Sequence, residues 1–314
     1  MTHAIRIHET GGPAVLRWDE VEVGAPGPGE ARVRHSAIGL NFIDTYHRSG
    51  LYPLPLPAVI GSEGAGTVVA VGPGVTEVAP GDRVAYAGVV GAYAEERLLP
   101  ADRLVPLPRD VDERLAAASM LKGMTAQYLL RRTHRVDAGE AILLHSAAGG
   151  VGLIAAQWAR ALGAKVIGTV STDEKAALAR EAGCDHVVVT SREDFVARVK
   201  EVTGGVGVRV VYDAVGKDTF RASLDCLAPL GLMVTYGNAS GPVEPISPLL
   251  LSQKGSLFLT RPTLMAYTAR REDLLATAAD LFAVLRSGTV KVRIGATFPL
   301  REAAAAHEAL EGRR

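Results

Sequence analysis

The chain has little cysteine, no net charge and no long hydrophobic run. Of its 314 residues only Cys184 and Cys226 are cysteines, too few for a disulfide framework, and nothing around them has the spacing of a zinc site. Lys plus Arg and Asp plus Glu both total 34, so no net field would attract nucleic acid or an anionic membrane. No apolar segment approaches the roughly 20 residues that span a bilayer. Residues 1–12 are polar and mixed, unlike a secretory signal, so we expect a cytoplasmic protein with two idle thiols.

The most informative stretch is residues 139–160, which reads G-E-A-I-L-L-H-S-A-A-G-G-V-G-L-I-A-A-Q-W-A-R. Residues 141–145 suit a buried parallel strand, 147–152 form a turn of small residues, and 153–162 follow as an Ala-rich helix. In a dinucleotide-binding unit the turn glycines let the backbone approach a pyrophosphate, whose charge sits on the helix N–H groups. Ala147 takes the place of the first glycine of G-x-G-x-x-G. The alternative is a glycine-rich turn that binds no ligand.

Strands and helices continue to alternate around this unit, which predicts a doubly wound parallel sheet of about six strands. At 314 residues with 48% hydrophobic content, the chain is long enough for two domains and a large core. The expected strands are 141–145, 166–170, 186–189, 208–212, 232–236 and 257–259, and the expected helices are 153–162, 175–182, 194–202, 219–227 and a short one near 249.

The two ends of the chain differ from this middle part. Residues 1 to about 120 contain short strands with turn residues and little helix, typical of a small antiparallel barrel. A helical pattern over 114–131 follows it. The last fifty residues predict a helix at 271–287, then a strand, then a helix at 300–310.

The run G-E-x-x-L-x-x-x-A-A-G-G-x-G-x-x-x-x-Q-x-x-R resembles the signature of quinone oxidoreductases, the zinc-free branch of the medium-chain dehydrogenases/reductases. The resemblance implies an α/β fold with a GroES-like β-barrel catalytic domain at 1–122, completed by 265–314, and a Rossmann NADPH-binding domain at 123–264. Members of the family usually continue into a final short strand, whereas this chain stops at Arg314; whether it is truncated or lacks that strand stays open. Further matching segments follow in the family's order at 41–53, 121–125, 209–216, 236–241 and 253–262.

The resemblance also bears on metal chemistry. Asn41 stands where the zinc enzymes of the superfamily have a cysteine ligand, and Ser62 stands where they have a histidine. An amide and a hydroxyl do not replace thiolate and imidazole for zinc, and the clustered cysteines of a structural zinc lobe are absent. We therefore predict a metal-free enzyme. Without a metal to polarise a carbonyl, hydride delivery to an electron-poor acceptor, such as a quinone or an activated alkene, needs much less activation.

Candidate catalytic residues lie in the segment 41–53. Asn41, Asp44 and Tyr46 are the catalytic candidates, and Tyr52 is close to them in sequence. The Tyr46 hydroxyl either donates a hydrogen bond to a developing oxyanion or packs against the cofactor. Asp44 is interpreted as a structural or ribose partner rather than a general base. Lys122, by resemblance, is either a surface charge or a contact to the acceptor.

The second expected strand ends without an acid at Val170, where NAD enzymes bind the ribose hydroxyls. Ser171, Thr172 and Lys175 follow it and favour a 2′-phosphate, although Lys175 as an ordinary exposed lysine is the alternative. By resemblance, Arg313 reaches the same phosphate, and a tyrosine of some relatives falls at Thr190. The expected cofactor is therefore NADPH. Its other expected contacts are Phe42, Ile43, Thr125, Tyr128, Gly149, Gly150, Val151, Tyr236, Gly237, Asn238 and Arg261.

These features together predict an NADPH-dependent quinone reductase. The alternatives are a reductase of enones or alkenals with the same cofactor, and an NADPH-binding protein without catalysis. The neutral charge and the lack of a basic–aromatic patch argue against nucleic acid as a partner. Residues 255–260 form an apolar edge strand that would aggregate if exposed, so we expect it to pair with its twin in a homodimer.

Overall fold

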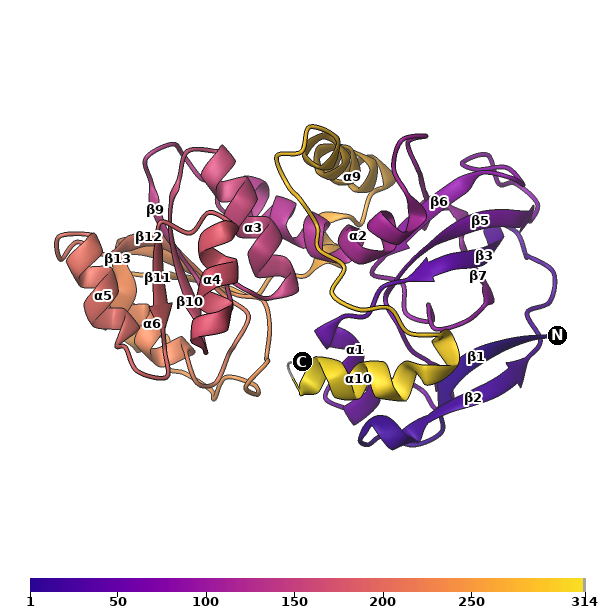
Figure 1. The fold of residues 1–314 in the computed structure, drawn as a ribbon, viewed down its shortest axis with the longest axis horizontal. Coiled ribbons are helices and arrows are strands. Elements are labelled where there is room, and N and C mark those ends of the chain that lie inside the picture. Colours follow the sequence, from indigo (N-terminus) through magenta and orange to yellow (C-terminus); the bar gives the residue numbers. More distant parts are fainter. Residues whose placement is uncertain (313–314) are drawn as a thin grey trace. The chain divides into compact units, whose positions relative to one another are not determined.

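The alternating middle part of the chain folds into one parallel sheet in the computed structural model, which describes residues 1–312 (Figure 1). The strand order is β11-β10-β9-β12-β13-β14, and all neighbouring strands are parallel. This order confirms the predicted doubly wound sheet of about six strands. The strands are Ala141–Leu144 (β9), Lys165–Val170 (β10), His186–Val189 (β11), Val208–Asp213 (β12), Leu227–Thr235 (β13) and Phe258–Thr260 (β14).

Helices cover both faces of this sheet. Alternate strand residues such as Leu143, Ile167 and Val211 form one buried cluster with residues of α5 and α6. Their neighbours Ile142 and Val210 point to the other face and are also fully buried. Sheets that are buried on both faces are built from nearly continuous apolar strands, which is the pattern of 141–145 in the sequence. The helices of this part are Gly150–Ala161 (α3), Asp173–Glu181 (α4), Phe195–Val202 (α5), Phe220–Cys226 (α6), Leu249–Gln253 (α7) and Leu264–Tyr267 (α8).

Two of these helices begin earlier than the sequence predicts. α3 begins at Gly150 rather than at 153, and α4 begins at Asp173 rather than at 175. Glycines have low helix propensity, so the turn glycines point to a later start, but here they form the first helical turn. For α4 the Thr172 hydroxyl accepts a hydrogen bond from the Lys175 backbone N–H, which makes Thr172 the N-cap.

Antiparallel sheets form the first part of the chain. One has the strand order β7-β3-β5-β6-β8 and the other the order β2-β1-β4, and a bridge between Ala4 and Ala94 joins β1 to the segment before β7. Short antiparallel strands are what the sequence predicts for this part. The strands are Thr2–Ile7 (β1), Leu16–Val21 (β2), Glu30–Ile38 (β3), Ala58–Val59 (β4), Glu63–Val71 (β5), Arg83–Ala87 (β6), Glu96–Pro100 (β7) and Val105–Pro106 (β8).

The contact pattern divides the described chain into two units. The first unit contains residues 1–121, 268–282 and the chain from 292 onward; the second contains 122–267 and 283–291. Helix Glu113–Tyr128 (α2) and the π-helical turn Leu129–Thr133 (η3) take the place of the predicted helix at 114–131. Three single turns of 3₁₀-helix occur at Pro13–Val15 (η1), Ala101–Arg103 (η2) and Leu300–Glu302 (η4).

In the first unit one short helix was not predicted in particular, and one predicted strand is wrong. Helix Phe42–Ser49 (α1) interrupts a region in which the sequence predicts little helix. The predicted strand between the last two helices does not form, because no neighbouring strand pairs with the backbone of residues 291–299. These last helices are Arg271–Arg286 (α9) and Ala303–Glu311 (α10).

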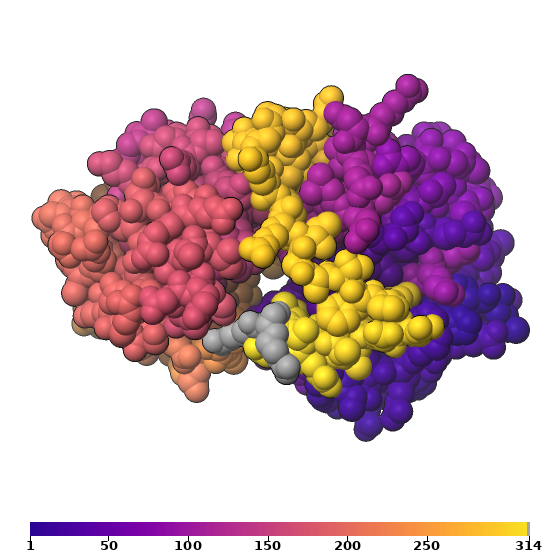
Figure 2. Space-filling model, in the orientation of Figure 1, coloured from indigo at the N-terminus to yellow at the C-terminus, as the bar shows by residue number. Residues whose placement is uncertain are grey.

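Helix α10 returns to the beginning of the chain. It contacts η1, and η4 just before it contacts β1, so that in Figure 2 the yellow C-terminal segment lies against indigo N-terminal residues of the same unit. Among residues 1–312, no helix is both long enough and apolar enough to cross a membrane.

Candidate functional site

Helix α1 begins among the predicted catalytic residues of the first unit. Asn41 is its N-cap, and the Asn41 backbone N–H donates to the Asp44 carboxylate at 2.9 Å. A side chain at the third helical position that reaches back to the N-cap is half of a capping box. Asn followed three residues later by Asp is therefore the sequence signal for this helix. The motif determines where α1 starts and so where Asn41 and Asp44 lie.

The Asp44 carboxylate is fully buried and accepts three hydrogen bonds. Besides the Asn41 backbone, the donors are the hydroxyls of Ser62, at 2.9 Å, and Tyr93, at 3.1 Å. Hydrogen bonds from several donors favour the ionised form of a carboxylate. A carboxylate held in this way is poorly suited to take up a proton. The geometry therefore favours a structural role for Asp44 over that of a general base.

The side chains at the zinc-ligand positions of related enzymes bind carboxylates here. The Asn41 amide donates to Glu63 at 2.7 Å, and the Ser62 hydroxyl donates to Asp44. Glu63 is fully buried and also accepts from the backbone N–H of Leu121 at 2.7 Å. These positions offer neither thiolate nor imidazole. Within residues 1–312, no three His, Cys, Asp or Glu side chains are grouped so that they could hold a metal ion.

A chain of buried hydrogen bonds leads from Asp44 to helix α10. The Tyr93 hydroxyl lies 3.0 Å from Nε2 of His307, and Arg48 donates to Nδ1 of His307 at 2.9 Å. Because a guanidinium only donates, His307 Nδ1 accepts; its Nε2–H then donates to Tyr93, and Tyr93 donates to Asp44. Burial, with the nearby Arg48, lowers the pKa of His307 to about 4 and keeps this ring neutral. Arg48 also pairs with both carboxylate oxygens of Glu311, at 2.9 and 2.8 Å.

No pattern in the sequence identifies Arg48, Tyr93 and His307 as partners. Arg48 and His307 are 259 residues apart, and Tyr93 and His307 are 214 apart. The only signal is the presence of His307 in an otherwise Ala-rich helix, and a buried histidine is common enough to carry no specific meaning. The tertiary structure alone brings these side chains to the start of α1.

Tyr46 packs among aromatic rings of the same segment. Its ring centroid lies 5.7 Å from that of Phe42 and 5.2 Å from that of Tyr52, both in edge-on contacts. Tyr46 is 9% exposed, whereas Phe42 is exposed and Ile43 half-buried. The accessible surface at the start of α1 therefore comes from Phe42 and Ile43. The role of Tyr46 as a hydrogen-bond donor stays a prediction.

In the second unit the glycine turn joins β9 to α3. Gly149 is the N-cap, and no side chain caps the helix there. A Cβ at Gly152 would lie 2.2 Å from the carbonyl oxygen of Ser146, so this position admits glycine alone. Gly150 is exposed, and Gly149 and Val151 are half-buried. The turn thus presents accessible backbone at the positive end of a helix, which suits an anionic ligand.

Lys122 lies over this turn. A Cβ at Gly150 would lie 2.8 Å from Cδ and 3.0 Å from Cε of Lys122, so the lysine stem lies beside the glycine, which itself stays exposed. Lys122 is half-buried, which is usual for a lysine whose stem packs while its ammonium reaches solvent. The structure therefore brings this residue to the glycine turn of its own unit.

The three residues predicted for a 2′-phosphate lie together at the start of α4. Lys175 Nζ is 3.5 Å from the Ser171 hydroxyl, and the Thr172 hydroxyl caps the helix. β10 ends at Val170, which is 5% exposed, so there is no carboxylate at the position where NAD enzymes bind the ribose hydroxyls. The hydroxyl of Thr190 donates to the Val170 carbonyl at 3.1 Å. Arg313, predicted for the same phosphate, lies outside the described residues.

The carboxyl ends of β12 and β13 pack closely. A Cβ at Gly237 would lie 2.5 Å from the Ala214 carbonyl oxygen, and the Tyr236 backbone N–H donates to the Asp213 carbonyl at 2.8 Å. The buried Asp213 side chain accepts from the backbone N–H of Val215 at 2.7 Å and orders the loop. The other predicted contacts near these strand ends are Asn238, which is half-buried, and Arg261, which is exposed.

Thr125 and Tyr128 belong to the part of α2 in the second unit. Tyr128 is 2% exposed, and its ring stacks on Tyr267 with centroids 4.5 Å apart and planes 10° from parallel. Burial raises the pKa of Tyr128. Thr125, one turn earlier, is 7% exposed. The stacking on Tyr267 fixes the orientation of the Tyr128 ring, and its role as a cofactor contact stays a prediction.

Two family models match the chain. The alcohol dehydrogenase GroES-like domain matches residues 27–109, and the zinc-binding dehydrogenase model matches residues 150–283. A quinone oxidoreductase from Pseudomonas aeruginosa is 54% identical over all of this chain and 97% of its own length. A 2-haloacrylate reductase from a Burkholderia species is 50% identical, again over all of this chain and 97% of its own length.

A solved quinone oxidoreductase structure is also similar to this chain. Escherichia coli quinone oxidoreductase complexed with NADPH superimposes with a TM-score of 0.97 at 50% identity, over 99% of this chain and 97% of that one. Its similarity covers both units of the present structure.

Proposed function

We propose that this chain, which belongs to the quinone oxidoreductase family, is an NADPH-dependent quinone reductase that works without a metal. The observation that carries the proposal is the buried cluster at the start of α1, where Asn41 and Ser62 donate to Glu63 and Asp44. Nothing in this cluster polarises a carbonyl as a zinc ion would. A quinone is already electron-poor by conjugation and needs no such help. The full-length similarity to quinone oxidoreductases supports the same reaction.

The second unit fits NADPH as the cofactor. Gly149, Gly150 and Val151 offer accessible backbone for the pyrophosphate, and Gly152 permits the close packing behind them. When bound, NADPH supplies a hydride from its nicotinamide ring. The further proposed contacts are Ser171, Thr172 and Lys175 to the 2′-phosphate, with Phe42, Ile43, Thr125, Tyr128, Tyr236, Gly237, Asn238, Arg261 and Arg313 around the rest of the molecule.

The first unit supplies the residues that position the acceptor in this proposal. Tyr46 donates a hydrogen bond to the acceptor oxygen as negative charge develops on it. Asn41 and Asp44 hold the start of α1 in place. We accordingly assign catalysis to residues 1–122 and 265–314, and NADPH binding to residues 123–264.

An activated alkene is the alternative acceptor. The 2-haloacrylate reductase is as similar to this chain as several of the quinone oxidoreductases. An enone, an alkenal or a haloacrylate would take the same hydride on a carbon–carbon double bond. The site residues described above serve both reactions.

Stopped-flow oxidation of NADPH and NADH tests the proposal. The acceptors are 1,4-benzoquinone, 9,10-phenanthrenequinone, a short 2-alkenal and 2-chloroacrylate. Fast oxidation of NADPH by the quinones alone is the expected result. Turnover with the alkenal or the haloacrylate alone would establish the alternative, and tight NADPH binding with negligible turnover would mean a binding protein. Lys175→Ala should raise the KM for NADPH far more than that for NADH.

We also propose a homodimer in the cytoplasm. β14 is the edge strand of the parallel sheet, and Phe258 and Leu259 on it are 61% and 38% exposed. An apolar edge of this kind is stable in solution when a second copy pairs with it. Phe258→Asp should convert a dimer into a monomer in light scattering, while Phe298→Asp, at an exposed apolar residue of the first unit, should not. A monomeric parent chain would contradict the proposal.

A further inference from the structure

Two acids stand beside the proposed phosphate site. Asp173 and Glu174 are the first residues of α4, where negative side chains stabilise a helix through its dipole. The same charges oppose a phosphate at Ser171 and Lys175. A carboxylate close to the end of the second strand is also what binds the ribose hydroxyls in NAD enzymes. The stability of α4 and the preference for NADPH therefore place opposite demands on Asp173.

Arg192 forms an ion pair with the Asp173 carboxylate. Its guanidinium NH2 lies 2.7 Å from Oδ1 of Asp173, and its NH1 lies 3.3 Å from Oε1 of Glu193. Asp173 raises the pKa of Arg192. The neighbouring acid Glu174 is held differently, by its own backbone N–H and by the Thr172 hydroxyl, which lower its pKa. Of the two acids, Asp173 is the one that an arginine neutralises.

The backbone explains why Arg192 reaches Asp173. β10 and β11 are parallel neighbours, and the hydrogen bond from the Thr190 hydroxyl to the Val170 carbonyl ties their carboxyl ends together. The segment that follows β11 therefore runs beside the turn that follows β10. Arg192 lies in that segment, 19 residues from Asp173 in the chain.

We propose that Arg192 makes the turn at residues 171–175 selective for a 2′-phosphate by pairing with the Asp173 carboxylate. Arg192 is a positioning residue, because it acts through Asp173. While the pair is formed, the Arg192 charge offsets the repulsion between Asp173 and the phosphate, and Oδ1 of Asp173 is engaged by the guanidinium. This inference rests on the proposed use of NADPH and identifies how this chain discriminates NADPH from NADH.

The test compares the Kd values of NADPH and NADH for the parent chain, Arg192→Gln, Asp173→Asn and the double variant. Binding is followed by nucleotide fluorescence, without an acceptor. Arg192→Gln should lower the ratio of the NADH Kd to the NADPH Kd about tenfold, the effect of a unit charge on a doubly charged phosphate at about 6 Å in water. Asp173→Asn in the same chain should restore the ratio. The effect should shrink at 1 M salt, because both charges are exposed.

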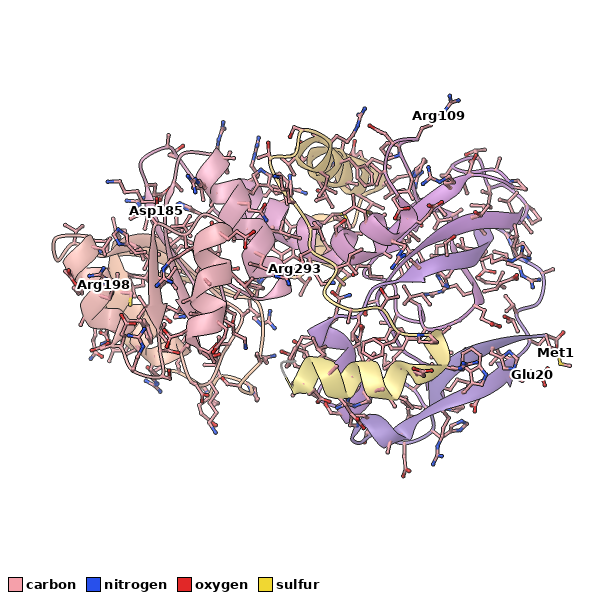
Figure 3. The ribbon with its side chains drawn as sticks, in the orientation of Figure 1. Met1, Glu20, Arg109, Asp185, Arg198 and Arg293 are labelled. Atoms are coloured by element: carbon pink, nitrogen blue, oxygen red, sulfur yellow. The ribbon has the colours of Figure 1, made fainter. Side chains whose placement is uncertain are left out.

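A matched control is available on helix α5. Arg198, labelled in Figure 3, forms an exposed pair with Glu201 at 2.6 Å, and Arg198→Gln should leave the ratio unchanged. An unchanged ratio in Arg192→Gln would overturn the proposal. So would a fall that Asp173→Asn fails to restore, because Arg192 would then contact the phosphate itself. If the parent chain binds both nucleotides equally, the choice of NADPH is wrong and the proposal falls with it.

Discussion

The N-termini of α1 and α3 carry two groups of predicted site residues, and they are built from different contacts. At α1 side chains bond to side chains: Asp44 binds Ser62 and Tyr93, which are 18 and 49 residues away, in the interior of the first unit. At α3 the backbone forms the site: Gly149 caps the helix without a side chain, and Gly150 is exposed.

The difference shows what each place can do. At the start of α1 the polar side chains form hydrogen bonds to one another. A network of this kind holds its members in one geometry. The turn at α3 keeps the N–H groups of its first helical residues uncapped by side chains, so a ligand can take the place of a cap. We infer that the polar groups at the start of α1 order a helix, whereas the turn before α3 leaves its backbone N–H groups available to a ligand.

Gly152→Ala should have the largest effect. The added Cβ would lie 2.2 Å from the Ser146 carbonyl oxygen, so the turn has to move. We expect at least a hundredfold weaker NADPH binding and a loss of about 3 kcal/mol in the stability of the second unit. Nucleotide titration and urea unfolding measure these two quantities. Gly295→Ala is the control, because a Cβ there meets nothing within 4 Å. Unaltered NADPH binding would rule out this turn as the nucleotide site.

His307→Leu should destabilise the first unit and leave nucleotide binding intact. The change leaves Arg48 and Tyr93 buried without the ring that joins them. The expected loss is about 2–4 kcal/mol in the free energy of unfolding. Each unit contains one of the two tryptophans, Trp18 and Trp158, so single-tryptophan variants report on the units separately. His8→Leu, at an exposed histidine, is the control. Weaker NADPH binding by a stable His307→Leu chain would contradict a purely structural role for this network.

Lower pH should reduce the free energy of unfolding of the first unit through the buried His307 and the half-buried His35. Burial lowers the pKa of His307 and of His35 from 6.5 to about 4. As the pH falls from 6.5 towards 4, the unfolded chain takes up these protons before the folded chain does, so the free energy of unfolding falls. The loss at pH 5 is about 2 kcal/mol for each histidine. Urea unfolding of a Trp158→Phe chain at pH 7 and pH 5 measures it.

His307→Gln should remove the part of this pH dependence that His307 contributes, while His35 and His47, whose pKa values burial also lowers, keep theirs. Reporting on one unit at a time matters here, because burial also lowers the pKa of His145 in the second unit. The same slope with and without His307 would show that its protonation does not limit stability in acid.

Lys122→Met should have the smallest effect and tests the turn before α3 directly. If the ammonium contacts the pyrophosphate, NADPH and NADH should both bind about tenfold more weakly, since both nucleotides carry that group. Lys122→Arg should keep most of the affinity. A raised KM for the acceptor with unchanged nucleotide binding would instead make Lys122 an acceptor contact.

Local patterns made the second unit predictable. Apolar runs of four to six residues separated by helical spacing correspond to the strands of the parallel sheet, and each strand pairs with a neighbour of the same kind. Ser171, Thr172 and Lys175 lie within five residues, so their proximity follows from the chain itself. The starts of α3 and α4 were misplaced by two or three residues, because capping decides them. Strand β13 begins at Leu227, five residues before the predicted strand, and the short helix α8 was not predicted.

The first unit was less predictable because its elements depend on distant partners. The segment 42–49 is too short to be helical by itself, and α1 exists because a capping box and a buried network hold it. Residues 291–299 alternate like a strand, but a strand needs a neighbour, and none pairs with them.

Sequence patterns alone were enough to predict the doubly wound sheet and the glycine turn, and they show that the residues at positions 41 and 62 are neither cysteine nor histidine. The assignment of Ser171, Thr172 and Lys175 to a 2′-phosphate stays a prediction from the sequence. Each of these is a matter of residue type within a short stretch. The tertiary structure decided the chain from Asp44 through Tyr93 and His307 to Arg48, and the pairing of Arg192 with Asp173. These contacts join residues that are distant in the sequence. Local residue preferences do not predict them, because they form only when whole helices and strands pack together.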